Sequence, residues 1–232
     1  MFWFYDYWYI VLVMPAVIFS IIASFKVNTT FEKYSRVRSS RGITGAEAAR
    51  RVLDANGLYS VKIEQVRGKL TDHYDPRNNT VYLSESVYSV PSAAAIGVAA
   101  HEAGHAVQHE VGYTPIKIRA AIIPVTNFAS QLSFPLILIG LLFSASDLIM
   151  LAYLGVACFG MSTLFQLVTL PTEFNASRRA LEAISSSGIL SRDEIGSARK
   201  VLSAAAMTYV AALLTSLLTL LRLLILANGR RR

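Results

Sequence analysis

Four long stretches with almost no charged residue constrain this chain of 232 residues more than any other feature. These stretches are residues 8–25, 122–143, 148–170 and 205–227, and the last of them contains one charge, Arg222. A helix needs about 20 consecutive apolar residues to cross the hydrocarbon core of a bilayer. We therefore predict four transmembrane helices, of which the middle two form a hairpin joined by residues 144–147. The first should be an uncleaved anchor, because residues 1–10 lack the basic start of a signal peptide.

The overall composition supports a membrane protein. Hydrophobic residues make up 53% of the chain and charged residues 16%, which excludes a disordered chain and an ordinary water-soluble domain. The net charge of +7 does not point to nucleic acid, because Lys and Arg beside apolar spans more often report membrane orientation. The single cysteine, Cys158, excludes an internal disulfide and a cysteine-based zinc site. The expected partner is the lipid bilayer.

The distribution of basic residues predicts the orientation. Residues 26–121 contain thirteen Lys and Arg and residues 171–204 contain five, whereas none precedes the first stretch. The positive-inside rule then places both polar segments in the cytoplasm. The tail Arg230-Arg231-Arg232 disagrees, because four spans would carry it to the other side. The predicted division is an anchor (1–25), a polar metallopeptidase segment (26–121), a transmembrane hairpin (122–170), a second polar segment (171–204), and a fourth helix with a basic tail (205–232).

The first polar segment contains signals for both helix and strand. The capping box Thr44-x-x-Glu47 predicts a helix that ends near Asp54. Two period-two alternations and a stretch free of proline then predict two strands and a longer helix. They are residues 59–66, 80–84 and 93–110. The second polar segment is predicted as helices at 171–187 and from 191 onward. The expected fold is a mainly α integral membrane protein with a small α+β domain on the cytoplasmic face.

The motif His101-Glu102-Ala103-Gly104-His105 lies inside the predicted helix at 93–110. Residues four apart project from one helix face, so two imidazoles can bind one ion. Zinc accepts neutral imidazole, and its catalytic sites combine three protein ligands with water. Glu102 is placed to accept a proton from that water without being a ligand. A polar helix face without metal is the alternative, but a chance match is improbable in a chain with four histidines. The motif predicts one catalytic Zn²⁺ ion.

His109 continues the same row of the helix but is not expected to bind the ion. It lies about 12 Å from His101 along the helix axis, which is too far for one ion to contact both side chains. We expect His109 to be a polar residue near the helix end, stabilised by the helix dipole.

The third ligand must come from another part of the chain on the same side of the membrane. The predicted hairpin returns the chain to that side just before Glu173. Ala176 and Ala180 share its helix face, so small side chains permit a close approach of the helix with the histidines. Glu173 is therefore the predicted third ligand, with Glu182 and Glu194 as weaker candidates. The alternative is that Glu173 only interacts with a helix dipole.

Three segments resemble a known family: HEAGHAVQ, PTEFNASRRAL and TDHYDPRNNTVYLSE. Together with the N-terminal span and the central hairpin, they are similar to the YugP-type neutral zinc metallopeptidases of bacterial membranes. The resemblance covers nearly the whole chain and implies hydrolysis of protein or peptide substrates at the bacterial cell (inner) membrane. In the wider gluzincin class, the third ligand is a Glu followed by Asp four residues later. Here Ser177 stands at that position, which weakens any supporting role carried over to it.

Two further features have alternative interpretations. His73 or Tyr74 can donate a hydrogen bond to the oxyanion of a tetrahedral intermediate, or they can simply shape a loop. His73 is retained as a candidate catalytic residue. The strand at 80–84 can offer an edge to an extended substrate or lie inside a small sheet.

These features together predict a membrane-integrated zinc endopeptidase that acts on membrane-associated or unfolded proteins. The main alternative is a non-catalytic membrane adaptor or scaffold, whose structural zinc would be closed by a fourth protein ligand. A transporter would require ionisable residues within the spans, but residues 122–170 contain only Asp147, at the turn. Because Glu173 comes three residues after Leu170, we expect cleavage close to the membrane surface.

Overall fold

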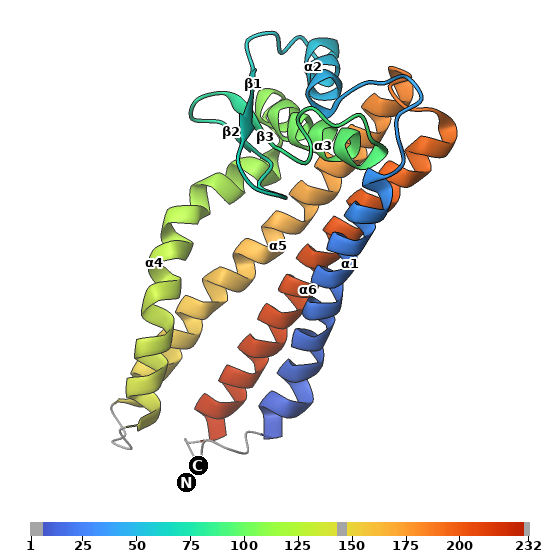
Figure 1. Ribbon diagram of the computed structural model, residues 1–232. Coiled ribbons are helices and arrows are strands. Elements are labelled where there is room, and N and C mark those ends of the chain that lie inside the picture. The colour runs from blue at the N-terminus through green and yellow to red at the C-terminus, as the bar shows by residue number, and fades with distance from the viewer. Residues whose placement is uncertain (1–6, 143–147, 230–232) are drawn as a thin grey trace. The chain divides into compact units, whose positions relative to one another are not determined.

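The computed structural model describes residues 7–142 and 148–229, which form a mainly helical protein with a small mixed sheet (Figure 1). The turn predicted at 144–147 and the basic tail at 230–232 lie outside the described residues. The helices are α1 (Met14–Ser35, preceded by the π-helical turn Tyr9–Val13), α2 (Gly45–Ala55), α3 (Ala93–Glu110), α4 (Thr114–Leu142), α5 (Ile149–Ser186) and α6 (Arg192–Gly229). The strands are β1 (Lys62–Val66), β2 (His73–Asp75) and β3 (Thr80–Ser84).

The chain divides into two compact units, each built from segments far apart in the sequence. The helical unit comprises Met1–Ala23, Lys117–Pro171 and Thr208–Arg232. The mixed unit comprises Ser24–Ile116 and Thr172–Met207, and it contains the sheet, α2 and α3.

Four helices are long and apolar enough to cross a membrane, as the uncharged stretches predicted. They are Tyr9–Ser35, Thr114–Leu142, Ile149–Ser186 and Arg192–Gly229. Each extends well beyond its uncharged stretch, because the flanking polar residues include no strong helix terminator. The separate helices predicted at 148–170 and 171–187 are one helix, and that boundary was wrong. Pro171 lies inside α5 without ending it, a tolerance known for prolines in membrane helices.

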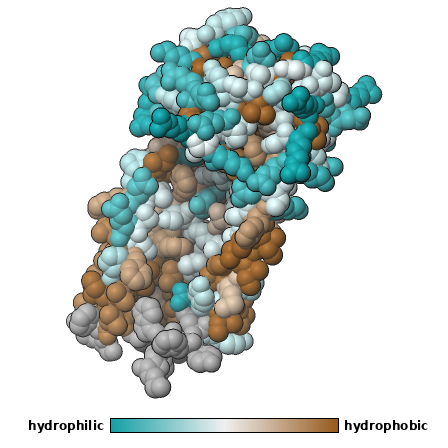
Figure 2. All heavy atoms as spheres, viewed as in Figure 1, coloured by the Kyte–Doolittle hydropathy of each residue, from teal (hydrophilic) through white to brown (hydrophobic). Residues whose placement is uncertain are grey.

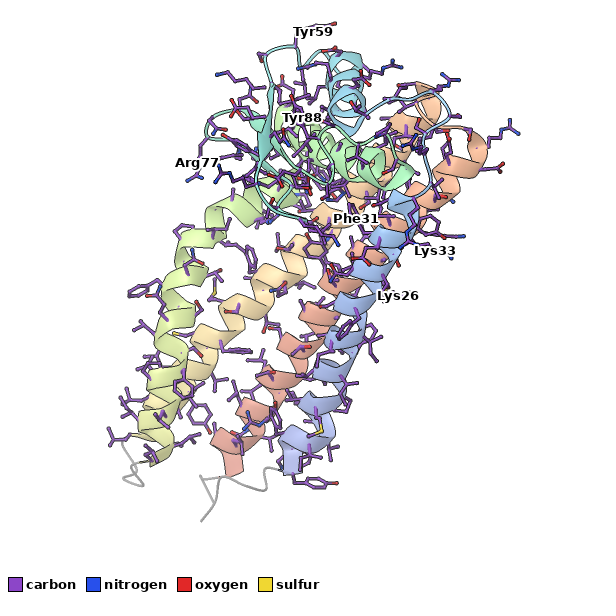
Figure 3. All side chains as sticks on the ribbon, viewed as in Figure 1. Lys26, Phe31, Lys33, Tyr59, Arg77 and Tyr88 are labelled. Carbon is purple, nitrogen blue, oxygen red and sulfur yellow. The ribbon has the colours of Figure 1, made fainter. Side chains whose placement is uncertain are left out.

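The surfaces of the two units differ in character. Large apolar side chains are exposed in the helical unit, including Phe128 and Leu167, as expected for helices that face lipid. Hydrophilic side chains gather over the mixed unit (Figure 2). There, Tyr59 and Arg77 point outward, whereas Phe31 is buried (Figure 3).

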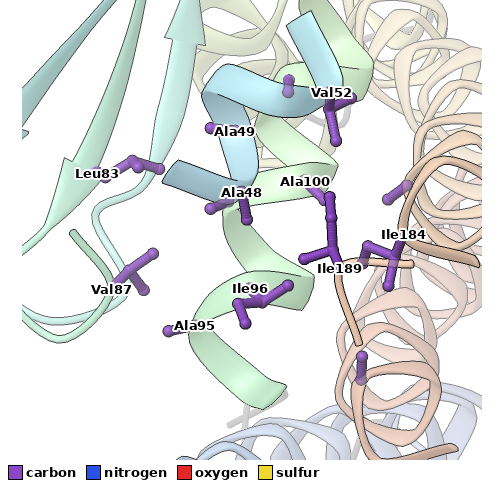
Figure 4. Close-up of a cluster of buried hydrophobic side chains, with 14 of the residues drawn as sticks. Ala48, Ala49, Val52, Leu83, Val87, Ala95, Ile96, Ala100, Ile184 and Ile189 are labelled. Atoms are coloured by element: carbon purple, nitrogen blue, oxygen red, sulfur yellow. The ribbon is translucent and has the colours of Figure 1, made fainter. Parts of the chain in front are cut away.

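The core of the mixed unit lies around α3 (Figure 4). Small residues of α2, among them Ala48 and Ala49, pack beside Ile96 of α3, and Ile184 of α5 joins the same cluster. Each of these four side chains is fully buried. The helix that carries the metal-binding motif is therefore held on several sides by apolar contacts.

The predicted capping box of α2 is confirmed, and a second cap begins α3. The Thr44 side chain accepts from the backbone N–H of Glu47, and the Glu47 carboxylate accepts from the N–H of Thr44. The Ser92 hydroxyl accepts from the backbone N–H of Ala95 at 3.2 Å and so begins α3. Each cap satisfies backbone donors that a helix start leaves without partners.

The sheet has the order β1-β3-β2, which decides between two open alternatives for β3 and corrects the interpretation of β2 as a loop. Strand β3 is central, parallel to β1 and antiparallel to β2, so it offers no edge to a substrate. Its Val81 and Leu83 are fully buried. The segment that contains His73 and Tyr74 is a strand and not a loop, because it pairs with β3. A segment of three residues is too short to show a periodic pattern in the sequence.

Candidate metal centre

Helix α3 places His101 and His105 on one face, one turn apart. Their rings are nearly perpendicular, with centroids 4.7 Å apart, and the side chains are only 13% and 12% exposed. The predicted helix at 93–110 matches the bounds of α3, so the two histidines lie on one helix face, as predicted.

Glu173 of α5 faces both histidines. Its Oε2 lies 3.2 Å from Nε2 of His101 and 3.5 Å from Nε2 of His105, and its side chain is 3% exposed. Two atoms that each lie 2.0–2.1 Å from one tetrahedral zinc ion are roughly 3.3 Å apart. The spacing of the carboxylate from each imidazole and the donor types therefore fit a zinc ion.

Small residues bring α3 and α5 together. A Cβ added to Gly104 would lie only 2.9 Å from the carbonyl oxygen of Ala176, closer than a side chain allows. Ala176 and Ala180 are fully buried. Any larger residue at position 104 would push the helices apart and separate Glu173 from the histidines.

Gln108 supports His105 and was missed by the sequence analysis. Its Oε1 lies 3.0 Å from Nδ1 of His105, and its Nε2 donates to the carbonyl oxygen of Thr172 and to Oδ1 of Asn175. The side chain is fully buried. Because the Gln108 amide donates elsewhere, its oxygen faces His105, which directs the Nε2 lone pair of the imidazole toward Glu173. The sequence signal that could have revealed this contact is the spacing of His105 and Gln108, because residues three apart on a helix are neighbours.

Ser177 contacts the other histidine. Its Oγ lies 3.1 Å from Nδ1 of His101, one helix turn after Glu173. A serine in place of the usual aspartate was expected to weaken any supporting role at this position. The structure shows that the hydroxyl still reaches the imidazole, although a neutral partner raises the basicity of the ring less than a carboxylate would.

Glu102 differs from Glu173 in its surroundings. It is buried, at 9% exposure, and its carboxylate makes no hydrogen bond within the part of the chain that the structure describes. Burial raises the pKa of Glu102, His101 and His105 oppose the shift, and the charges of Glu173 and Asp72 reinforce it. A carboxyl group with a raised pKa can both accept and return a proton near neutral pH.

Burial lowers the pKa of His105, but its hydrogen bond with Glu173 and the charges of Glu102 and Glu173 outweigh this, so the pKa is raised overall. Because an imidazole must be deprotonated to bind a metal ion, metal binding at His105 would compete with its protonation.

The other candidates for a metal ligand lie elsewhere. Among the described residues, the group of side chains able to bind one metal ion consists of His101, His105 and Glu173. Glu182 is exposed and pairs with Arg178 at 3.6 Å. Glu194 caps α6 at Ser191 and accepts from the backbone N–H of Ser40.

His109 and the residues of β2 make other contacts. The His109 ring lies 5.5 Å from that of Tyr74. The Tyr74 hydroxyl donates to Oδ1 of Asn79 at 2.9 Å, so in this arrangement its proton is not available to a substrate. His73 is exposed, stacks on Tyr82 and has Nδ1 2.8 Å from the carbonyl oxygen of Thr71. Its catalytic role stays a prediction.

The chain is similar to known proteins. Residues 9–228 match a family described as "putative neutral zinc metallopeptidase". A Bacillus subtilis (strain 168) protein named "Putative membrane protease YugP" is 52% identical over 223 residues, which cover 96% of this chain and 98% of that protein. No solved structure matches the chain.

Proposed function

The chain belongs to the neutral zinc metallopeptidase family, and from that premise we propose that it is a membrane-integrated zinc endopeptidase. The observation that carries the proposal is the convergence of Glu173 on the Nε2 atoms of His101 and His105. In this proposal, these three residues hold one zinc ion.

The side chains divide the chemical work. When bound, zinc would polarise the substrate carbonyl and lower the pKa of water. Glu102 accepts a proton from the attacking water and later returns it to the leaving amine. Its buried carboxylate, one residue after His101 on α3, suits both steps. Gln108 and Ser177 hold the two imidazoles in the orientation that binding requires.

We place the site on the cytoplasmic side of the bacterial inner membrane. The support is the sequence, in which residues 26–121 and 171–204 contain eighteen (thirteen plus five) of the 22 Lys and Arg. Both candidate ligand segments belong to these basic regions.

We further propose that the substrates are peptide bonds near a membrane surface. Helix α5 is continuous from Ile149 to Ser186, so Glu173 lies about 4–5 Å along the axis beyond Leu170, where the uncharged stretch ends. A site tied so closely to a span favours juxtamembrane segments or loops of membrane proteins over folded soluble proteins.

The test places one cleavable sequence at increasing distances from a transmembrane anchor and also offers it without an anchor. The purified protein in lipid should cut the anchored sequence fastest when it is close to the membrane. Glu102→Gln is the blank that removes contaminating protease activity. Equal rates at every distance and without an anchor would contradict the juxtamembrane preference, and no cleavage above the blank would contradict the peptidase itself.

A further inference from the structure

A cavity of about 770 Å³ lies between the mixed-unit parts of α5 and α6. It is lined from Phe174 to Ser186 on α5 and from Ile195 to Met207 on α6. His101, His105, Glu173 and Glu102 are absent from its lining. We call this cavity the α5–α6 groove. It adjoins the candidate metal centre at Ser177, which lines the groove and contacts His101.

The groove changes in polarity along its length. One end is formed by Phe174 and Met207, which are 47% and 38% exposed although they are large and apolar. Arg178 and Arg199 line the groove farther along the two helices. The lining therefore matches an elongated amphiphile with an apolar end and an anionic end.

The apolar end of the groove is the end nearest to the predicted spans. The uncharged stretches end at Leu170 on α5 and begin at residue 205 on α6, so Phe174 and Met207 lie at or near the span boundaries. Arg178 lies about 12 Å and Arg199 about 9 Å beyond these boundaries along the helix axes. Arginine side chains are long enough to span much of these distances and bring a guanidinium group to the depth of lipid phosphates.

The lining contains two arginines and one acidic residue, Glu182, so the groove has a net positive charge that can attract an anion. Arg178 is paired with Glu182 at 3.6 Å, but both side chains are more than 60% exposed, so the pair is weak. Within residues 7–142 and 148–229, Arg199 makes no ion pair or hydrogen bond. Guanidinium groups bind phosphate oxygens with two parallel hydrogen bonds.

We infer that the α5–α6 groove binds one anionic phospholipid, with an acyl chain against Phe174 and Met207 and the phosphate between Arg178 and Arg199. A peptide occupant is less favoured, because an extended chain has backbone donors and acceptors along its whole length, whereas the polar groups of the groove are concentrated away from its apolar end. This inference does not depend on peptidase activity.

Native mass spectrometry of the purified full chain tests the inference. The ligand is dioctanoylphosphatidylglycerol, compared with dioctanoylphosphatidylcholine and with soluble glycerol 3-phosphate. We expect one phosphatidylglycerol per chain, weaker binding of phosphatidylcholine, and no retained glycerol phosphate. The double variant Arg178→Gln/Arg199→Gln should bind phosphatidylglycerol at least about tenfold more weakly. Arg192→Gln, an exposed arginine of α6 outside the groove, is the matched control and should bind like the wild type.

Three results would overturn the inference. Equal binding of the two lipids would remove the role of charge, and wild-type affinity in the double variant would remove the arginines. Complete displacement of the lipid by an uncharged apolar decapeptide at lower concentration would assign the groove to a peptide. Because binding is measured without turnover, each result is distinct from a failure of the peptidase proposal.

Discussion

Polar side chains are handled differently in the helical unit and at the candidate metal centre. In the helical unit, some neutral hydroxyls pair with each other, as Ser20 does with Thr215 at 3.0 Å and Thr163 with Ser216 at 2.7 Å. At the metal centre, the buried carboxylates of Glu102 and Glu173 lie beside imidazoles, and only Glu173 has hydrogen-bond partners among the described residues.

The difference separates polar side chains that stabilise helix packing from those that can take part in a reaction. A pair of hydroxyls satisfies one donor and one acceptor at little cost in a low-dielectric setting. A buried carboxylate without a donor is destabilising unless it is neutralised or paired with a cation. The apolar packing around α3 holds such groups in place, so we assign them to chemistry and the hydroxyl pairs to helix packing.

The largest effect is expected when a candidate ligand is removed. His101→Ala, His105→Ala or Glu173→Ala should abolish both zinc retention and activity, because the remaining side chains leave an incomplete site. The loss of zinc affinity should exceed the roughly 10–100-fold that loss of a supporting residue costs. Zinc content of the purified proteins is measured by plasma mass spectrometry.

Glu182→Ala and His109→Ala are the controls for this series, and both should retain one zinc per chain. An empty site in His109→Ala, with zinc kept in Glu173→Ala, would show that the ligand set has been assigned to the wrong residues.

Glu102→Gln should affect activity without affecting metal. The amide keeps the shape of the side chain but cannot accept a proton, so the cleavage rate should fall by about 10²–10⁴-fold. Zinc content should equal that of the wild type. Substantial retained turnover would remove Glu102 from the role of base.

A smaller effect is expected at Gln108. Gln108→Ala should weaken zinc binding roughly 10–100-fold, measured by competition with a chelator. Gln108→Glu should not restore it, because the new carboxylate would face the carbonyl oxygen of Thr172 and Oδ1 of Asn175. The exposed Gln65→Ala on β1 is the control. Wild-type zinc affinity in Gln108→Ala would show that the contact with His105 is incidental.

The smallest effect is expected in the helical unit. Thr163→Val keeps the shape of the side chain and removes the pair with Ser216, so the free energy of unfolding should fall by about 0.6 kcal/mol. Steric-trap unfolding in bicelles can measure this change. Zinc affinity should stay at the wild-type level, and a marked loss of zinc would break the distinction between the two regions.

Local patterns in the sequence predicted much of the fold. The uncharged stretches predicted the four candidate spans, and the capping box at Thr44 predicted the start of α2. Helix lengths and strand order depend on contacts between distant segments. Strand β2 has three residues and exists through its pairing with β3, so no periodic signal marked it.

The candidate site shows the same division. His101, Glu102 and His105 were found from one helix turn, and Glu173 from the small residues that follow it. Gln108 was missed because its partners Thr172 and Asn175 lie 64 and 67 residues further along the chain. Only the packing of α3 against α5 brings these groups together.

The central claim is that His101, His105 and Glu173 hold one zinc ion and leave a position open for water. Zinc K-edge X-ray absorption of the zinc-loaded Glu102→Gln protein tests it most directly, because the site is kept while turnover is removed. We expect one zinc per chain, coordinated by two imidazole nitrogens and otherwise by oxygen, at 2.0–2.2 Å. A third imidazole, a sulfur ligand or the absence of stoichiometric zinc would contradict the account.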